Sequence, residues 1–343
     1  MINLQKTIII AEAGVNHNGD LERAKELIKV AAKAGADFVK FQTFKADKIV
    51  SKQAKKASYQ AKNINDGDDS QYNMLKKLEI PDAWYPELLD LCKLEGIKFL
   101  STGFDNDSIN FLDELPIELF KIPSGEITNK PYLEHIATKK KPVILSTGMA
   151  DIKEIKDAVT VLINAGLDKS GLTILHCNTE YPTPMADVNL KAMLHIKKEL
   201  GVEIGYSDHT LGIEVPIAAV ALGAKVIEKH FTLDRNLPGP DHKASLEPDE
   251  LFEMIKSIRN IEMAIGGNGI KEPSTSEKEN KKVVRKSIHT SKALAKGHVI
   301  KESDLIALRP GDGLSMMNDS QVIGRKLARD LNEFHKISIS DLL

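Results

Sequence analysis

Eight short runs of aliphatic and β-branched residues alternate with helical segments along residues 1–265 of this 343-residue chain. The runs are TIIIAEAG (from residue 7), ADFVKFQTF (36), IKFLSTGF (97), ELFKIPSGE (118), PVILSTGM (142), LTILHCNTEYPT (172), EIGYSDHT (203) and KVIEKHFT (225). Between them, segments such as LERAKELIKVAAKAG and EVPIAAVALGA repeat apolar residues at intervals of three and four, and a glycine often precedes the next run. The pattern predicts eight strands that alternate with helices.

This number and spacing of units is typical of an α/β protein with a (β/α)8 TIM barrel, a fold of roughly 250 residues. An open doubly wound sheet is the alternative, but the glycine fingerprint GxGxxG is absent after the first run. The segment GGNGIKEPSTSEKENKK at 266–282 is polar and predicts a linker. We therefore expect a catalytic barrel at 1–265, a linker at 266–282 and a small second domain at 283–343.

The composition argues against several classes of protein. The 47 Lys+Arg residues nearly balance the 49 Asp+Glu residues, so no nucleic-acid or membrane partner is expected. No apolar run approaches the roughly 18–20 residues of a membrane span, and the N-terminus does not resemble a signal peptide, which predicts a cytoplasmic protein. Cys92 and Cys177 lie in apolar surroundings without a CxxC partner and are expected to be buried free thiols.

Polar side chains follow or end each of the eight runs. Active sites of TIM barrels lie at the carboxyl ends of the strands, where these residues would gather. The candidates that this rule selects are Glu12, Asn16, His17, Lys40, Gln42, Ser101, Thr102, Lys121, Ser124, Glu126, Ser146, Thr147, Asn178, Tyr181, Ser207, Asp208, His209, Glu228 and His230.

Two of these candidates, His209 and His230, end the seventh and eighth runs. Neighbouring strands lie about 4.8 Å apart, so both imidazoles can reach one ion at the roughly 2.0–2.2 Å of a metal–nitrogen bond. Two histidines without cysteine suit a divalent metal such as Mn²⁺, with Mg²⁺ or Co²⁺ as alternatives. The first run lacks the HxH of amidohydrolase-type barrels, which disfavours a metallohydrolase.

Lys40 and Lys121 lie inside apolar runs, where a lysine is costly to bury unless it meets an anion or takes part in chemistry. One interpretation is a Schiff-base aldolase, in which a lysine attacks a carbonyl carbon. The other is an anion-binding site formed by both lysines with the nearby hydroxyl groups. Those hydroxyls favour the anion site, and they belong to Thr102, Ser124, Ser146 and Ser207.

Eight motifs occur in order along the chain: IIIAEAGVNHNGD, GADFVKFQTFKAD, FKIPSGEITNKPYLE, ILSTGM, TEYPTP, GYSDHTLG, IEKHFTLD and PGPDHKASLEPDEL. Together they closely resemble the sialic acid synthase family, which makes N-acetylneuraminate and related nonulosonates. The resemblance implies a barrel followed by a small antifreeze-like (SAF) domain, which RKSIHTSKALAKGHVIKESDLIALRPGDG would open. It also implies a transferase that condenses phosphoenolpyruvate with an N-acetylated hexosamine in the presence of a divalent metal.

The same resemblance assigns roles to individual residues. It implies His209 and His230 as metal ligands, and Glu228 beside a metal-bound water. The implied phosphoenolpyruvate contacts are Lys40, Thr102, Lys121, Ser124, Ser146, Asn178 and Ser207. The implied sugar contacts are Glu12, Gln42, Glu126, Tyr181, Asp241 and Arg309. Either Glu12 or Glu228 could activate the water that adds to phosphoenolpyruvate.

We therefore predict an N-acetylneuraminate synthase that uses N-acetylmannosamine and releases phosphate by C–O cleavage. An N,N'-diacetyllegionaminate synthase using 2,4-diacetamido-2,4,6-trideoxymannose is the alternative, and a Schiff-base aldolase or a sugar-binding regulatory protein is a more distant one. The resemblance also implies a domain-swapped homodimer, in which the antifreeze-like domain of one subunit brings Arg309 to the barrel of the other.

Overall fold

The computed structural model describes residues 6–64 and 66–343. The chain forms two compact units, Met1–Gly266 and Gly267–Leu343. Within the described residues, no helix combines the length and the apolar character needed to cross a membrane. Cys92 and Cys177 are buried free thiols, as the sequence predicts.

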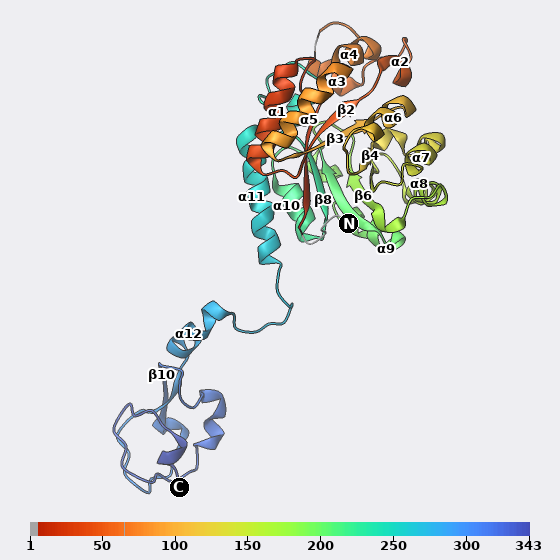
Figure 1. Ribbon diagram of the computed structural model, residues 1–343. Helices are drawn as coiled ribbons and strands as arrows, with labels where there is room; N and C mark the ends of the chain where they lie inside the picture. The colour runs from red at the N-terminus through yellow and green to blue at the C-terminus, as the bar shows by residue number, and fades with distance from the viewer. Residues whose placement is uncertain (1–5, 65) are drawn as a thin grey trace. The chain divides into compact units, whose positions relative to one another are not determined.

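The described part of the first unit contains a sheet of eight parallel strands, which correspond one to one with the eight apolar runs (Figure 1). They pair in the order β3-β2-β1-β8-β7-β6-β5-β4, and the end strands β3 and β4 also lie side by side, giving a near-closed barrel. This confirms the predicted fold class. The strands are β1 (Ile8–Gly14), β2 (Phe38–Thr43), β3 (Lys98–Gly103), β4 (Phe120–Ile122), β5 (Val143–Ser146), β6 (Leu172–Cys177), β7 (Glu203–Asp208) and β8 (Val226–His230).

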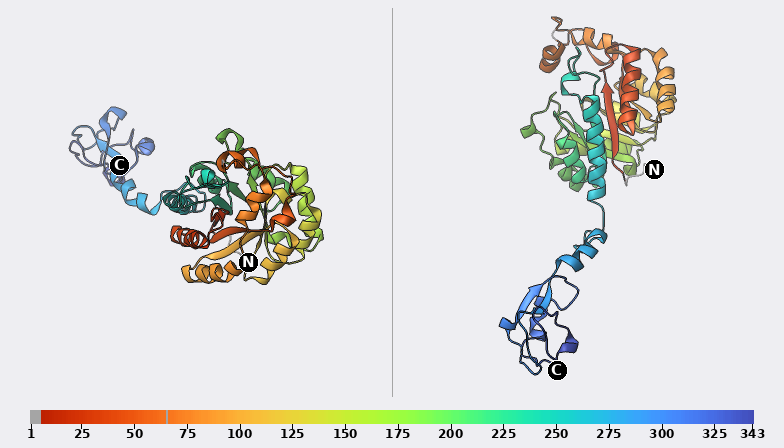
Figure 2. Two further views of the ribbon diagram at one scale, coloured as in Figure 1. Left: turned by 90° about the horizontal axis from the view of Figure 1, so that it is seen from above. Right: turned by 90° about the vertical axis from the view of Figure 1, so that its left-hand side faces the viewer.

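Helices surround the strands on the outside of the barrel (Figure 2). The first of them begins where Asp20 caps the amide of Arg23 and ends at Gly35, whose φ of 87° is accessible to glycine at little cost. Its apolar face is buried, as the recurrence of apolar residues every three or four positions predicts. The helices that follow the strands are α1 (Leu21–Ala34), α5 (Tyr85–Glu95), α6 (Asn106–Glu114), α7 (Lys130–Ala137), α8 (Ile152–Asn164), α9 (Ala192–Leu200), α10 (Glu214–Ala221) and α11 (Pro248–Ala264).

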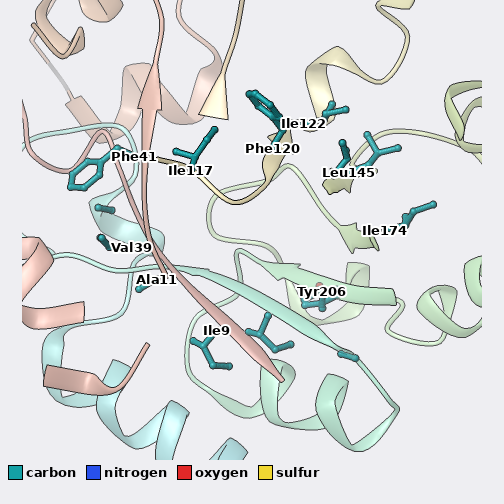
Figure 3. Packing of buried hydrophobic residues seen from close by; sticks show 14 of the residues in the cluster. Ile9, Ala11, Val39, Phe41, Ile117, Phe120, Ile122, Leu145, Ile174 and Tyr206 are labelled. Carbon is teal, nitrogen blue, oxygen red and sulfur yellow. The ribbon is translucent and has the colours of Figure 1, made fainter. Parts of the chain in front are cut away.

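Alternation along the strands separates two apolar layers. Side chains of one parity, such as Ile9, Val39 and Tyr206, pack between the strands and the helices (Figure 3). Side chains of the other parity form a separate apolar cluster inside the barrel. This inner cluster consists of Ile8, Ile10, Phe38, Leu100, Leu119, Ile144, Leu175 and Val226. It fills the amino-terminal part of the barrel and leaves the opposite end for other chemistry.

An insertion between β2 and α5 carries three further helices: α2 (Ala46–Ile49), α3 (Ser58–Ile64) and α4 (Gln71–Leu78). Met74 and Leu78 of α4 pack with Val15 and Phe44 in a small apolar cluster of their own. The insertion is therefore tied to the loops that follow β1 and β2.

The second unit contains α12 (Thr275–Val284) and the antiparallel pair β9 (Ser287–Thr290) and β10 (Leu305–Leu308). Helix α12 begins in a capping box formed by Ser274 and Glu277, so the second half of the segment expected as a linker is helical. The unit has its own apolar core of Ile288, Leu294, Ile300, Val322, Leu327, Leu331, Ile337 and Leu342.

The second unit contains two copies of one ionic arrangement. Asp304 is buried and is held by Lys292 at 2.9 Å and His298 at 2.7 Å. Asp341 is also buried and is held by Arg329 at 2.6 Å and His335 at 3.2 Å. The spacing 292, 298, 304 equals the spacing 329, 335, 341, and the Leu294 and Leu331 amides each donate to the other's carbonyl at 2.8 Å. The small core is thus supported by two related buried carboxylates.

We predict that the second unit loses stability in acid through Asp341. Burial raises the pKa of this carboxyl, but the Ser338 amide and Arg329 outweigh burial and lower the pKa from 3.8 to about 2. Because the folded pKa is depressed, the stabilisation is present above pH 3.8 and is lost as pH falls toward 2. Asp341→Asn should lower the free energy of unfolding of the second unit at neutral pH by roughly 2 kcal/mol. It should also flatten the dependence of that free energy on pH.

Hydrogen exchange of peptides from residues 288–342, labelled between pH 2 and pH 7 in the full chain, measures this effect. Asp312→Asn is the matched control, because Asp312 forms a solvent-exposed pair with Lys336 that should contribute little to stability. Equal effects of the two substitutions would contradict the assignment.

Candidate active site

The inner face of the barrel changes from apolar to polar one repeat above the inner apolar cluster. Every strand contributes one side chain to this layer, because residues two positions apart face the same side. The side chains are Glu12, Lys40, Thr102, Lys121, Ser146, Cys177, Ser207 and Glu228, and all are buried. They line one cavity of about 640 Å³ at the carboxyl ends of the strands.

Two lysines and two glutamates form the charged centre of this layer. Lys40 Nζ lies 2.8 Å from Glu12 Oε2 and 3.6 Å from Glu228 Oε2. Lys121 Nζ lies 3.5 Å from Glu228 Oε1. Lys40 also donates to Thr102 Oγ1 at 3.0 Å. Both lysines are therefore buried beside carboxylates, which offsets the cost of removing their charge from water.

The hydroxyl groups of the layer bind the same charged groups. Lys121 Nζ donates to Ser146 Oγ at 2.7 Å, and Ser207 Oγ donates to Glu228 Oε1 at 3.1 Å. Ser124, in the 3-10 helix η2 (Ser124–Glu126) after β4, accepts from the Gly148 amide at 2.9 Å. The predicted combination of two lysines with four hydroxyls thus lines a single cavity.

The two glutamates have opposite pKa shifts. Burial raises the pKa of Glu12, and the nearby Glu228 charge raises it further, although Lys40 opposes both effects. Burial also acts on Glu228, but Lys121 and Lys40 outweigh it and lower the pKa of that carboxyl. Burial lowers the pKa of Lys121. A neighbouring pair of carboxyls with different proton affinities is the usual basis for separate acid and base roles.

His209 follows β7 and His230 ends β8, and their ring centroids are 5.3 Å apart. His209 Nδ1 donates to the Asn178 carbonyl at 2.5 Å, which leaves the lone pair of the neutral ring on Nε2. Burial lowers the pKa of His209 to about 4 and that of His230 well below its usual value. Both rings are therefore neutral at pH 7, which is the form that binds a metal.

The protein groups around the two histidines fit a divalent metal with an open coordination shell. Within the described residues, no cluster of three or more His, Cys, Asp and Glu side chains is arranged to enclose an ion. His230 Nδ1 is buried and has no hydrogen-bond partner among those residues, and Asp241 Oδ2 lies 4.0 Å from it. Two imidazoles would have to be completed by oxygen ligands from water or substrate.

Aromatic and acidic side chains form the outer part of the cavity. Tyr181 stacks on Tyr59 with centroids 5.1 Å apart and lies 4.0 Å from the His209 ring. Asp241 is buried, and burial raises its pKa to about 7. Gln42 donates to Glu12 Oε1 at 3.4 Å.

The insertion at residues 44–84 supplies cavity residues that the sequence analysis did not predict. Tyr59, Gln60, Gln71 and Met74 line the cavity from α3 and α4. A spacing signal could have revealed them, because β2 and β3 begin 60 residues apart, at 38 and 98, and no other consecutive barrel strands begin more than 31 apart. Long loops at the carboxyl ends of barrel strands commonly carry functional residues. Cys177 was likewise not predicted as a cavity residue.

The structure brings together most of the predicted site residues. The cavity is lined by Glu12, Lys40, Gln42, Thr102, Lys121, Ser124, Glu126, Ser146, Tyr181, Ser207, His209, Glu228, His230 and Asp241. Asn178 contributes its carbonyl to His209, while its side chain accepts from the Glu180 amide at 2.8 Å. Arg309 belongs to the second unit, where its Nε donates to the Val284 carbonyl at 3.0 Å.

Comparison with known proteins places this barrel among the synthases that build nonulosonic acids. The NeuB family model matches residues 27–271 and the SAF domain model matches residues 285–333. The chain therefore belongs to the NeuB family, and it is an enzyme. These matches confirm the predicted family and the predicted SAF domain.

Two curated relatives are named N,N'-diacetyllegionaminic acid synthase. The one from Campylobacter jejuni is 52% identical over 96% of this chain and 98% of its own length. The one from Legionella pneumophila is 51% identical over 94% of this chain and 91% of its own. A crystal structure of N-acetylneuraminic acid (sialic acid) synthetase from Leptospira borgpetersenii is 36% identical, with a TM-score of 0.69, and covers 80% of this chain and 90% of that one.

These relatives correct the predicted activity. The sequence analysis favoured an N-acetylneuraminate synthase, but the relatives above 50% identity are legionaminic acid synthases, whereas the sialic acid synthetase is 36% identical. The physical reason is that the quoted motifs mostly supply the strand ends. Tyr59, Gln60, Gln71 and Met74 line the outer part of the cavity and lie outside those motifs, so the motifs describe only part of the cavity wall.

We predict that His209→Ala and His230→Ala each weaken Mn²⁺ binding at least about tenfold, because each removes one of two imidazole ligands. Electron paramagnetic resonance of free Mn²⁺ during titration measures the affinity. His195→Ala is the matched control, because His195 is an exposed histidine on α9 and its loss should leave the affinity unchanged. Wild-type affinity in either site variant would refute the metal assignment.

Proposed function

We propose that this enzyme is an N,N'-diacetyllegionaminic acid synthase, which condenses phosphoenolpyruvate with 2,4-diacetamido-2,4,6-trideoxymannose. The observation that carries the choice of acceptor is the identity above 50% with two synthases of that name over more than 90% of the chain. The buried lysines of the barrel mouth support phosphoenolpyruvate as the second substrate.

Phosphoenolpyruvate would bind at Lys40 and Lys121. Its phosphate and carboxylate need several cationic and hydroxyl donors, and the cavity offers both lysines together with Thr102, Ser146 and Ser207. The two lysines already lie beside carboxylates, so an arriving anion competes with Glu12 and Glu228 for them. The high proton affinity of Glu12 helps this exchange, because a protonated Glu12 no longer holds Lys40 as an ion pair.

The acceptor sugar would lie in the outer half of the cavity, near His209 and His230. These two histidines would hold a divalent metal such as Mn²⁺. When bound, the metal would supply Lewis-acid polarisation of the aldehyde oxygen. Tyr181, Gln42 and Asp241 line this cavity and would bind the hydroxyl and acetamido groups of the sugar.

The reaction forms one C–C bond and breaks one C–O bond. The methylene carbon C3 of phosphoenolpyruvate attacks the aldehyde carbon, which leaves a cationic centre at C2, and the aldehyde oxygen takes up a proton. Water then adds to the central carbon and gives a proton to Glu228, which is ionised and faces the anion site. The hydroxyl group that water left on the central carbon then loses its proton, and phosphate leaves with the bridging oxygen. The product is the keto acid. Glu12, which holds a proton more readily, is the donor to the aldehyde oxygen.

The outer wall supports an acceptor with additional methyl groups. Ile49, Val50, Met74, Leu75 and Phe104 line the cavity on the side of the insertion. Compared with N-acetylmannosamine, the proposed acceptor has a second acetyl methyl and a C6 methyl in place of a hydroxymethyl group. Burial of each apolar group is worth roughly 0.8 kcal/mol, so the two together favour this acceptor by roughly tenfold.

We predict that kcat/KM for phosphate release is at least about tenfold higher with 2,4-diacetamido-2,4,6-trideoxymannose than with N-acetylmannosamine.

With ¹⁸O in the bridging position of phosphoenolpyruvate, mass spectrometry should find the label in phosphate. Lys121→Met should raise KM for phosphoenolpyruvate, because it removes binding of an anion. Label in the sugar acid would exclude the C–O cleavage mechanism, and a preference for N-acetylmannosamine would exclude the proposed acceptor.

We propose, in addition, that the active form is a domain-swapped homodimer in which Arg309 of one subunit binds the sugar at the barrel of the other. This proposal rests on the family resemblance, and a planar guanidinium suits acetamido and hydroxyl oxygens. Arg309→Ala and His209→Ala homodimers should each be nearly inactive. A co-refolded mixture should recover about a quarter of the wild-type activity, because half of the dimers are hybrids with one intact site.

Native mass spectrometry of differently tagged subunits measures the hybrid fraction, and the phosphate-release assay measures the recovery. The control is a mixture of His209→Ala with His230→Ala subunits, in which both substitutions lie on the barrel and no intact site can form. Confirmed hybrids without recovered activity would refute a shared site.

A further inference from the structure

An ion pair lies directly behind the two histidines. Asp208 precedes His209 and Lys229 precedes His230, and the two residues are register partners on β7 and β8. Both side chains have the parity of Tyr206 and Ile227, which pack toward the helices, so they face away from the cavity. Both are fully buried. Neither contacts the cavity, and the proposed reaction does not use them.

The ion pair is part of a closed hydrogen-bonded turn. Lys229 Nζ lies 2.6 Å from Asp208 Oδ2 and donates to the Thr210 carbonyl at 2.5 Å. The Thr210 amide donates to Asp208 Oδ1 at 3.0 Å, and Thr210 Oγ1 donates to Asp208 Oδ2 at 3.0 Å. Lys229 therefore binds both sequence neighbours of His209, Asp208 and Thr210, to the adjacent strand β8.

His209 forms two further hydrogen bonds outside this turn. Its carbonyl accepts from the Thr183 amide at 2.9 Å, and its Nδ1 donates to the Asn178 carbonyl. Both partners lie after β6, on the far side of β7 from Lys229. His209 is thus fixed from both neighbouring strands: the loop after β6 holds its own polar groups, and Lys229 on β8 holds residues 208 and 210.

Stability does not explain a buried ion pair at this position. Removing two charges from water costs several kcal/mol per ion, and well-packed apolar residues of similar size are often at least as stable. A buried ion pair with directed hydrogen bonds does, however, select one conformation of the chain. This ion pair lies next to His209 and His230, the two cavity side chains whose rings must face the same ion to bind it together.

We propose that Asp208 and Lys229 are positioning residues that fix the imidazole of His209 relative to that of His230. The proposal rests on the proposed function only in its second readout, metal binding. The fixed ring orientation is a property of the protein alone, and outer contacts of this kind typically change metal affinity by roughly 10- to 100-fold when they are lost.

The test uses the double variant Asp208→Asn/Lys229→Met in the full chain, which replaces the ion pair without leaving one buried charge unpaired. The first readout is the ¹⁵N-histidine NMR spectrum without metal, in which loss of the His209 signal in His209→Gln identifies it. Wild type should show one His209 signal with a slowly exchanging Nδ1 proton. In the double variant we expect exchange at least about tenfold faster, with shifted or split ring signals.

The second readout is Mn²⁺ affinity, measured by electron paramagnetic resonance, which should fall roughly 10- to 100-fold in the double variant. Thr210→Val provides a milder change that keeps both charges, and it should move both readouts in the same direction by a smaller factor. If the double variant does not fold, Thr210→Val alone tests the positioning role.

The matched control is Arg259→Met/Asp37→Asn, which removes an ion pair of 3.1 Å near the amino-terminal end of β1. It should leave the His209 signal and the Mn²⁺ affinity within about twofold of wild type while lowering stability. Wild-type values of both readouts in folded Asp208→Asn/Lys229→Met or Thr210→Val would overturn the proposal. If wild type binds no Mn²⁺, the metal part of the proposed function fails, and the His209 signal alone tests the positioning role.

Discussion

Burial of two lysines inside the barrel is the constraint on which the rest of the site depends. A lysine removed from water without a partner would lose its proton or unfold the chain, so each needs an anion within a few ångströms. Glu12 and Glu228 supply that charge, and they can do so only because β1 and β8 are neighbours and place both carboxylates on the inner face. Closure of the barrel and the charge balance of its mouth therefore require each other.

Under the proposed function, the same arrangement would let an anionic substrate displace an internal ion pair. An ion pair of fixed strength would bind the lysines permanently, but Glu12 is held in a site where burial raises its proton affinity. Protonation of one carboxyl frees one ammonium group, whereas Glu228 stays ionised between Lys40 and Lys121. The site therefore gains a positive charge without moving a backbone atom, which keeps the cost of reorganisation low.

Strand periodicity made the fold and the inner site predictable, while long-range contacts did not follow from it. Lys40 and His230 were found because a polar side chain at the end of an apolar run has a defined place in a barrel. Tyr59 was missed, since its position depends on how α3 packs against Tyr181 rather than on any local pattern. The bond between Asp208 and Lys229 was also not predicted, because alternation along a strand gives the face of each residue but not which residues of β7 and β8 are register partners.

The division between strand ends and insertion also explains why motifs indicated the family better than the acceptor. Residues such as Lys121 are fixed by the strands, and a change there disturbs both the charge balance and the barrel. The wall formed by Tyr59 and Met74 belongs to short helices with a small apolar cluster of their own, so its side chains can change at a cost of about 1 kcal/mol each without disturbing the barrel. Differences of that size are comparable to those that discriminate between two sugars. Under the proposed function, the acceptor would therefore be selected by the part of the chain whose sequence the fold constrains least.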